Sequence, residues 1–245
     1  MPEGYSLGGR HIHDYLVEMT DKDVPPAPPI KNNDEEQGGR DGGWDFGVQY
    51  LPKIITVDHY ILAETKQERK DMIRSLAGIT NPRKGSQELI FDDEPDKMYF
   101  ARLNEQFALD KEVSSYSDFT LIYICYDPFT YSTEEYTRNI SGSGTIDHEG
   151  THVSRPVLVI DHNGGAATIT NTEPSGRKQE VIFKSSTAPG QYTIDMKEGI
   201  ILRGNESGEK HIDSVQWFEM PEGTNTITHS NNISGITVIY RHTWL

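Results

Sequence analysis

The sequence predicts a mainly β protein of two β-rich domains, the first of which carries one packed α-helix. Glycine and proline are frequent, with 22 and 13 of 245 residues, and this profile favours short strands and many turns over long helices. Only one segment shows the spacing of an amphipathic helix, whereas strand candidates recur through the second half. The length suits two domains, and we place them at residues 1–130 and 131–245.

Charge and hydropathy narrow the classes of function. Hydrophobic residues make up 34 % of the chain, which is enough to bury cores and argues against global disorder. The net charge is -15, and no cluster of lysine and arginine could neutralise nucleic-acid phosphates or hold an anionic membrane. Met1–Arg10 lacks a signal-peptide pattern, and no apolar stretch approaches the roughly 20 residues of a membrane helix. We expect a soluble protein without nucleic-acid or membrane partners.

The first 62 residues alternate between weak strand signals and breakers. Residues 1–24 are a weak strand region, and the prolines of residues 25–29 hold the next segment extended, in a rigid loop. Residues 31–43 are polar and glycine-rich, which predicts a loop without core-forming residues. Residues 51–62 are rich in β-branched and aromatic side chains and predict a strand.

One helix is predicted over about residues 66–77. Thr65 and Glu68 have the spacing of a capping box, in which each side chain satisfies a free backbone N–H. The apolar residues that follow fall on one face: Met72, Ile73 and Leu76. Gly78 stands where a glycine commonly ends a helix. The helix should therefore pack on the domain by one side.

A hairpin and a closing strand complete the first domain. Residues 88–91 and 98–103 predict paired strands around the acidic turn 92–96. The turn has carboxylates for calcium but lacks the spacing of a calcium-binding loop, so a bare solvated turn is favoured. Residues 119–126 predict an apolar strand, in which the single cysteine, Cys125, is expected to be buried and inert.

The second domain shows no helical periodicity. Residues 131–150 are polar and rich in serine and glycine, and the domain boundary is placed at their start. Short strand candidates separated by turns then predict a β-sandwich, at residues 156–161, 167–171, 179–183, 192–196, 199–202, 214–219, 224–228 and 236–240.

Histidine motifs offer the strongest hints of chemistry. Residues 148–152 spell the zinc-protease string H-E-x-x-H, which needs a helix to bring both histidines to one face. Gly150 and Thr151 disfavour helix, and in an extended segment the two histidines lie about 13 Å apart, so a chance match is favoured. His11 and His13 could bind a metal with Asp14, but a solvated polar face is the preferred interpretation. No phosphate-binding or dinucleotide motif occurs, so no catalytic residue, metal or cofactor is assigned.

The order of these features resembles the distal tail proteins of siphophages, the long-tailed bacteriophages with flexible tails. The resemblance spans almost the whole chain and rests on an ordered succession of short motifs, at residues 40–47, 53–57, 68–69, 89–95, 98–100, 119–129, 214–218, 221–225 and 236–241. The proline-rich and acidic stretch 25–39 departs from the family pattern. No large insertion interrupts either domain, so the sugar-binding modules of longer relatives are expected to be absent.

The resemblance implies a fold and a structural role. It implies an N-terminal β-barrel-like domain with a helix that forms a homo-hexameric ring, and a C-terminal galectin-like sandwich. The implied partners are the tail tube protein, the tail-tip protein and a receptor-binding protein. The expected location is the tail tip of the virion, after synthesis in the cytoplasm of the host bacterium. Whether one ring or two stacked rings form stays open.

One loop is a candidate subunit contact. Arg40, Asp41, Gly42 and Gly43 form a glycine-rich turn that allows close backbone approach, as at a subunit contact, although an ordinary solvated loop is an equal alternative. Two other functions are kept. A carbohydrate-binding module would rest on the C-terminal sandwich, but Trp217 beside Glu219 is expected to belong to the core. A zinc hydrolase would rest on His148 and His152.

Overall fold

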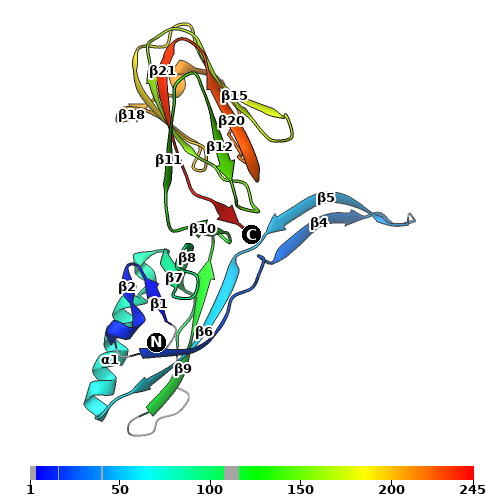
Figure 1. Ribbon diagram of the computed structural model, residues 1–245. Helices are drawn as coiled ribbons and strands as arrows, with labels where there is room; N and C mark the ends of the chain where they lie inside the picture. The colour runs from blue at the N-terminus through cyan, green and yellow to red at the C-terminus, as the bar shows by residue number, and fades with distance from the viewer. Residues whose placement is uncertain (1–3, 16, 40, 108–115) are drawn as a thin grey trace. The chain divides into compact units, whose positions relative to one another are not determined.

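The expectation of a mainly β protein is confirmed. The structure, a computed structural model, describes residues 4–15, 17–39, 41–107 and 116–245. The described residues form antiparallel strands and a single α-helix (Figure 1). The chain divides into two compact units, Met1–Thr130 with Leu245, and Tyr131–Trp244.

The N-terminal unit is built on one antiparallel sheet with the strand order β2-β1-β7-β8-β9-β6-β3. Its elements are β1 (Tyr5–Leu7), β2 (Arg10–His11), the 3-10 turn η1 (Ile12–Tyr15), β3 (Val17–Asp23), β6 (Lys53–Leu62), β7 (Gln87–Phe91), β8 (Lys97–Leu103) and β9 (Tyr116–Cys125). Side chains of β6 alternate strictly between buried and more exposed positions, as period-2 patterning requires. The predicted hairpin is present as β7 and β8.

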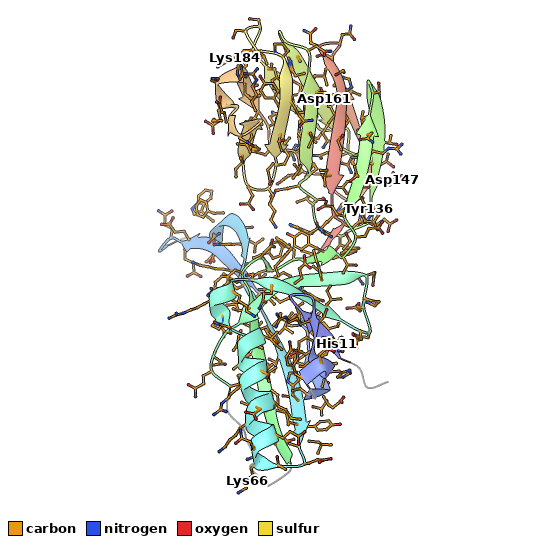
Figure 2. The ribbon with its side chains drawn as sticks, turned by 90° about the vertical axis from the view of Figure 1, so that its left-hand side faces the viewer. His11, Lys66, Tyr136, Asp147, Asp161 and Lys184 are labelled. Atoms are coloured by element: carbon orange, nitrogen blue, oxygen red, sulfur yellow. The ribbon has the colours of Figure 1, made fainter. Side chains whose placement is uncertain are left out.

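The helix α1 (Lys66–Ile79) begins as predicted and ends later. Thr65 Oγ1 accepts a hydrogen bond from the Glu68 N–H at 3.1 Å, while the Glu68 carboxylate accepts from the N–H of Glu64 at 2.8 Å. Gly78 does not end the helix, because Ile79 is buried against the core and holds the last turn in place. The cap is Thr80, and the 3-10 turn η2 (Pro82–Lys84) follows. Figure 2 shows α1 with Lys66 at its first turn.

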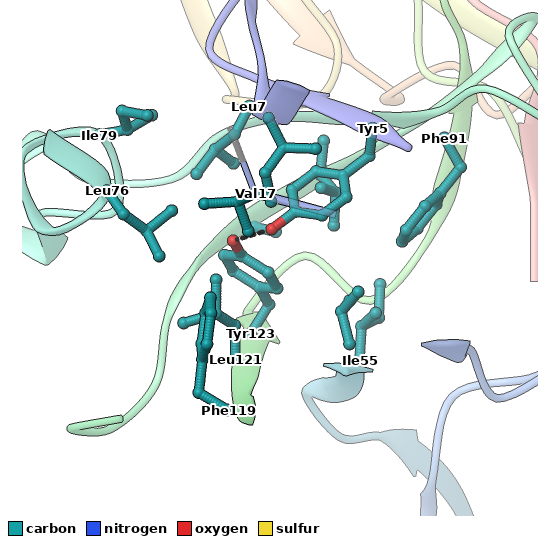
Figure 3. Packing of buried hydrophobic residues seen from close by; sticks show 14 of the residues in the cluster. Tyr5, Leu7, Val17, Ile55, Leu76, Ile79, Phe91, Phe119, Leu121 and Tyr123 are labelled. Atoms are coloured by element: carbon teal, nitrogen blue, oxygen red, sulfur yellow. Dashed lines mark hydrogen bonds between the residues drawn. The ribbon is translucent and has the colours of Figure 1, made fainter. Parts of the chain in front are cut away.

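The core of this unit contains a buried polar triad. Tyr5 on β1 places its hydroxyl 2.9 Å from the hydroxyl of Tyr123 (Figure 3). The same hydroxyl lies 3.1 Å from His59 Nε2. The His59 ring stacks on Phe119 with ring centres 5.0 Å apart. Buried side chains from α1 and the sheet surround the triad. The triad therefore ties the short first strand to the two long central strands.

The acidic turn after β7 is more than a bare solvated turn. Asp92 accepts hydrogen bonds from the Gly4 N–H at 2.9 Å and from His11 Nε2 at 3.1 Å. Asp93 forms an ion pair with Lys22. The turn is solvated as expected, but it is not bare, because Asp92 and Asp93 fasten the N-terminal segment and β3 to it.

The C-terminal unit is a sandwich of two antiparallel sheets that share one hydrophobic core. Its strands are β11 (Tyr136–Ile140), β12 (Ser143–His148), β13 (Val157–His162), β14 (Ala167–Thr172), β15 (Lys178–Phe183), β16 (Gly190–Asp195), β17 (Ile200–Arg203), β18 (Glu206–Ser207), β19 (Ile212–Val215), β20 (Gly223–His229) and β21 (Ile233–Tyr240), with the 3-10 turn η3 (Glu209–His211). The short strand β10 (Thr130–Ser132) pairs with β22 (Thr243–Trp244). The sheet orders are β11-β21-β13-β16-β17-β18 and β12-β20-β14-β15-β19.

Seven of the eight strand candidates of this unit are present, whereas the candidate 214–219 overlaps β19 only at residues 214–215. The prediction missed the short strand β18 and the strands β11 and β12 in the polar segment. β11 and β12 fall within residues 131–150 and carry few apolar residues, of which Ile140 and Ile146 reach the core. Trp217 is 38 % exposed, so its expected place in the core is wrong. Phe218 is buried instead, because neighbouring residues of an extended segment point to opposite sides.

Candidate assembly surface

The segment predicted as a polar loop forms half of a two-stranded hairpin, here called the arm. The arm consists of β4 (Ile30–Glu36) and β5 (Gly43–Tyr50), which pair with each other and with no other described strand. Gly39 and Gly42 adopt the left-handed backbone conformation in the turn. The loop prediction over residues 31–43 is wrong for residues 31–36, which form β4. The prediction missed this strand because β4 has no apolar alternation and is held as a strand by its backbone pairing with β5 and by no buried face.

A β-bulge divides the arm into two differently facing parts. Val48 pairs with Asn32, but Asp45 pairs with Asp34, so Phe46 and Gly47 together oppose a single residue of β4. Gly47 has a φ of 89°, a conformation that suits glycine, and its N–H donates to Asp45 Oδ1 at 2.7 Å. A one-residue shift reverses the side-chain alternation. By this register Ile30, Val48 and Tyr50 share one face, and Trp44 and Phe46 share the other.

Both faces of the arm present large apolar side chains to solvent. Every residue of β5 is exposed. The exposed fractions are 57 % for Ile30, 50 % for Trp44, 66 % for Phe46, 60 % for Val48 and 39 % for Tyr50. Large exposed apolar side chains gathered on one element indicate an interaction site, and an isolated two-stranded hairpin is at best marginally stable in water. The arm therefore has the properties of a segment that packs against another chain.

The predicted contact loop forms the tip of the arm. Arg40 lies outside the described residues. Asp41 and Gly42 form the turn, and Gly43 is the first residue of β5. A Cβ on Gly43 would lie 3.2 Å from the carbonyl oxygen of Glu35, which limits the space for a side chain. The prediction missed the apolar residues of β5. The alternation of Trp44, Phe46, Val48 and Tyr50 was the signal that could have revealed them.

The zinc-protease string does not form the helix that its chemistry requires. His148 ends β12, and its Nε2 donates to the carbonyl oxygen of His152 at 2.7 Å. His148 Nδ1 lies 3.2 Å from Nδ1 of His242, within the sandwich. Burial lowers the pKa of His148 below its usual value. Across the described ranges, no three His, Cys, Asp or Glu side chains gather as metal ligands would.

The remaining candidates are structural. His11 contacts Asp92, and its ring lies 4.6 Å from that of His13, while His13 faces Glu18 at 3.2 Å. Cys125 is buried on β9, and burial raises the pKa of its thiol to about 12, which removes its nucleophilic form at neutral pH. Among the residues that the structure describes, no helix is long and apolar enough to cross a membrane.

One protein-family model matches most of the N-terminal unit. Residues 13–125 match the model of the phage tail protein RIFT-related domain. Most of the N-terminal unit is thus similar to a phage tail domain. The match includes the arm, α1 and most of the sheet. No curated protein sequence matches the chain.

Solved structures extend the similarity beyond the phage tail domain. The Dit protein of phage SPP1, described as a paradigm of the hub adsorption apparatus in phages that infect Gram-positive bacteria, superposes with a TM-score of 0.82 at 15 % identity. That match covers 99 % of both chains. A chain of the phage P2 baseplate in its activated conformation with Ca has a TM-score of 0.51 at 10 % identity, over 98 % of both chains. The resemblance to siphophage distal tail proteins is confirmed by the phage tail domain and by the fold of the whole chain.

Proposed function

We propose that this protein is a structural, non-enzymatic subunit of the phage tail tip, which closes into a homo-hexameric ring that serves as a hub of the baseplate. The match to a phage tail domain supports a role in the tail. The similarity of the whole chain to the fold of the SPP1 Dit protein supports a place in the hub of the baseplate. The main observation in support of ring formation is the arm, which presents exposed apolar side chains on both faces.

A ring needs an interface between two different surfaces of the same chain. The arm supplies one such surface, because it belongs to the N-terminal unit but adds nothing to that unit's sheet. Burying its apolar side chains against the next copy would contribute about 25 cal/mol for each Å² removed from water. We assign ring formation to residues 1–130 and include Arg40, Asp41, Gly42 and Gly43, at the tip of the arm, in the subunit contact.

The second unit has a different role in this proposal. We assign to residues 131–245 a galectin-like sandwich that faces the partners of the ring. The ring, single or in two stacked copies, would join the tail tube protein to the tail-tip protein and carry a receptor-binding protein during host adsorption. The protein would be made in the cytoplasm of the host bacterium and reside in the virion.

Labelling of intact virions tests the proposed location. Antibodies raised against the purified chain and coupled to gold are applied to particles of the phage that encodes it, and the particles are viewed by electron microscopy. We expect gold at the end of the tail distal to the capsid. A control antibody against the capsid protein should label only the head. Label from this antibody along the capsid, or its absence from tails that carry a tip, would contradict the proposal.

A further inference from the structure

A groove on the N-terminal unit has a charge that complements the charge of the arm. The groove measures about 510 Å³ and lies between η2 and the end of β8, where Pro82, Arg83, Arg102 and Leu103 contribute to its lining. Its lining combines the apolar residues Pro82 and Leu103 with two arginines and polar residues. The arm of the same chain does not line the groove.

The two arginines are held ready for an acidic partner. Asn81 Oδ1 accepts a hydrogen bond from the Arg83 N–H at 3.0 Å, and this cap fixes the turn that carries Arg83. Arg102 donates to the Tyr126 hydroxyl at 3.1 Å and lies over its ring, 4.7 Å from the centroid. Among the described residues neither guanidinium forms an ion pair with a carboxylate.

The arm has the complementary charge. It carries five carboxylates against two basic residues, Lys31 and Arg40, and the carboxylates are those of Asp34, Glu35, Glu36, Asp41 and Asp45. The apolar side chains of β5 lie among them. The groove in turn places two arginines beside a single glutamate, Glu105, on a chain with a net charge of -15. Opposite charges of this kind set the orientation and partner of an interface.

We propose that the groove beside η2 receives the arm of the next copy of this chain. The inference rests on the proposed ring and names its interface. Figure 1 draws the arm leaving the N-terminal unit on the side away from α1, whereas η2 directly follows α1. Donor and acceptor surfaces on different sides of one unit allow each copy to bind the next in the same sense, which is how a ring closes.

Charge reversal tests this assignment. The variant Arg83→Glu with Arg102→Glu is compared with the wild type by sedimentation velocity, and circular dichroism checks its fold. We expect the dissociation constant of the assembly to rise by at least about tenfold, because like charges would meet across the contact. Since Arg102 packs on Tyr126, the single variant Arg83→Glu is measured as well. It should weaken assembly in the same direction.

Rescue and a matched control sharpen the test. Adding Glu35→Lys and Glu36→Lys to the reversed groove should restore most of the affinity. The control Arg138→Glu with Lys178→Glu makes the same change in net charge on exposed residues of the C-terminal unit and should leave assembly unchanged. If the wild type forms a ring and the reversed-groove variant assembles equally well, the groove assignment alone is overturned. The same holds if the arm substitutions do not restore assembly of the reversed-groove variant. A wild-type chain that never assembles would overturn the ring itself.

Discussion

A single buried imidazole links the stability of the N-terminal core to pH. His59 is 2 % exposed, and burial lowers its pKa from 6.5 to about 3. The folded protein therefore keeps His59 neutral where the unfolded chain binds a proton, so the stabilisation is complete above pH 6.5 and is lost as the pH falls from 6.5 towards 3. We expect His59 alone to lower the free energy of unfolding by about 2 kcal/mol when the pH falls from 7.5 to 5.

Denaturant unfolding at the two pH values measures this loss. The variant His59→Gln should be less stable at pH 7.5, because it disturbs the contact with the Tyr5 hydroxyl, but it should lose less stability on acidification than the wild type. Equal pH dependence in both proteins would show that His59 is protonated in the folded state, contrary to its burial.

A glycine at a backbone crossing makes a second prediction at the residue scale. A Cβ on Gly150 would lie 1.9 Å from the carbonyl oxygen of Thr243, which also accepts the His152 N–H at 3.0 Å. Gly150→Ala should therefore lower the thermal midpoint of the C-terminal unit, by the equivalent of about 3 kcal/mol or more. Gly235→Ala is the control, because its Cβ would meet only ordinary contacts, at 3.8 Å. Equal thermal midpoints for the two variants would show that the backbone of Thr243 does not restrict the side chain at position 150.

At the scale of elements, α1 contains a correctable weakness. Gly78 lies on the exposed side of the last turn, and a Cβ there would meet no atom within 4 Å. Gly78→Ala should stabilise the N-terminal unit by about 0.5–1 kcal/mol, since glycine in a helix interior costs that much in backbone entropy. Thr65→Ala should destabilise it by about 1 kcal/mol through loss of the cap. Thermal unfolding of both variants tests the two signs, and a destabilised Gly78→Ala protein would contradict the helix boundary at Ile79.

The arm is the element whose apolar residues serve assembly and not the fold. Phe46→Ser and Val48→Ser change side chains on opposite faces of β5, and both are well exposed in one chain. We expect each to change unfolding free energy by less than about 0.5 kcal/mol but to weaken self-association. Ile200→Ser, at a residue 47 % exposed in the C-terminal unit, serves as control in sedimentation velocity. Unaltered self-association in both arm variants would remove the arm from the interface.

Prediction from sequence succeeded where local chemistry and burial agreed. Thr65 and Glu68 set the start of α1, and the β-branched and aromatic residues of 51–62 marked the central strand, whose side chains alternate between buried and exposed positions. It failed where other parts of the molecule decide. The polar strand β4 forms only because β5 pairs with it, α1 continues past Gly78 because Ile79 reaches the core, and Trp217 is exposed because Phe218 takes the buried side. The contact assigned to Arg40, Asp41, Gly42 and Gly43 stays a prediction. The alternation in β5 could have revealed its apolar residues, but their division between two faces depends on the bulge register.

At the scale of the whole molecule, one acidic chain joins an N-terminal unit that is similar to a phage tail domain and carries the arm to a C-terminal β-sandwich. A net charge of -15 keeps such a chain from non-specific association, so assembly depends on specific surfaces such as the arm and its proposed groove. The sandwich carries no described element that extends from it as the arm extends from the N-terminal unit. The proposed hub function and the groove assignment both depend on closure of the ring.

The molar mass of the purified full-length chain, measured by size-exclusion chromatography with light scattering over a range of concentrations, tests ring closure most directly. We predict a discrete species at six or twelve times the 27.7 kDa of one chain. A monomer at every concentration would contradict a ring that this chain closes by itself.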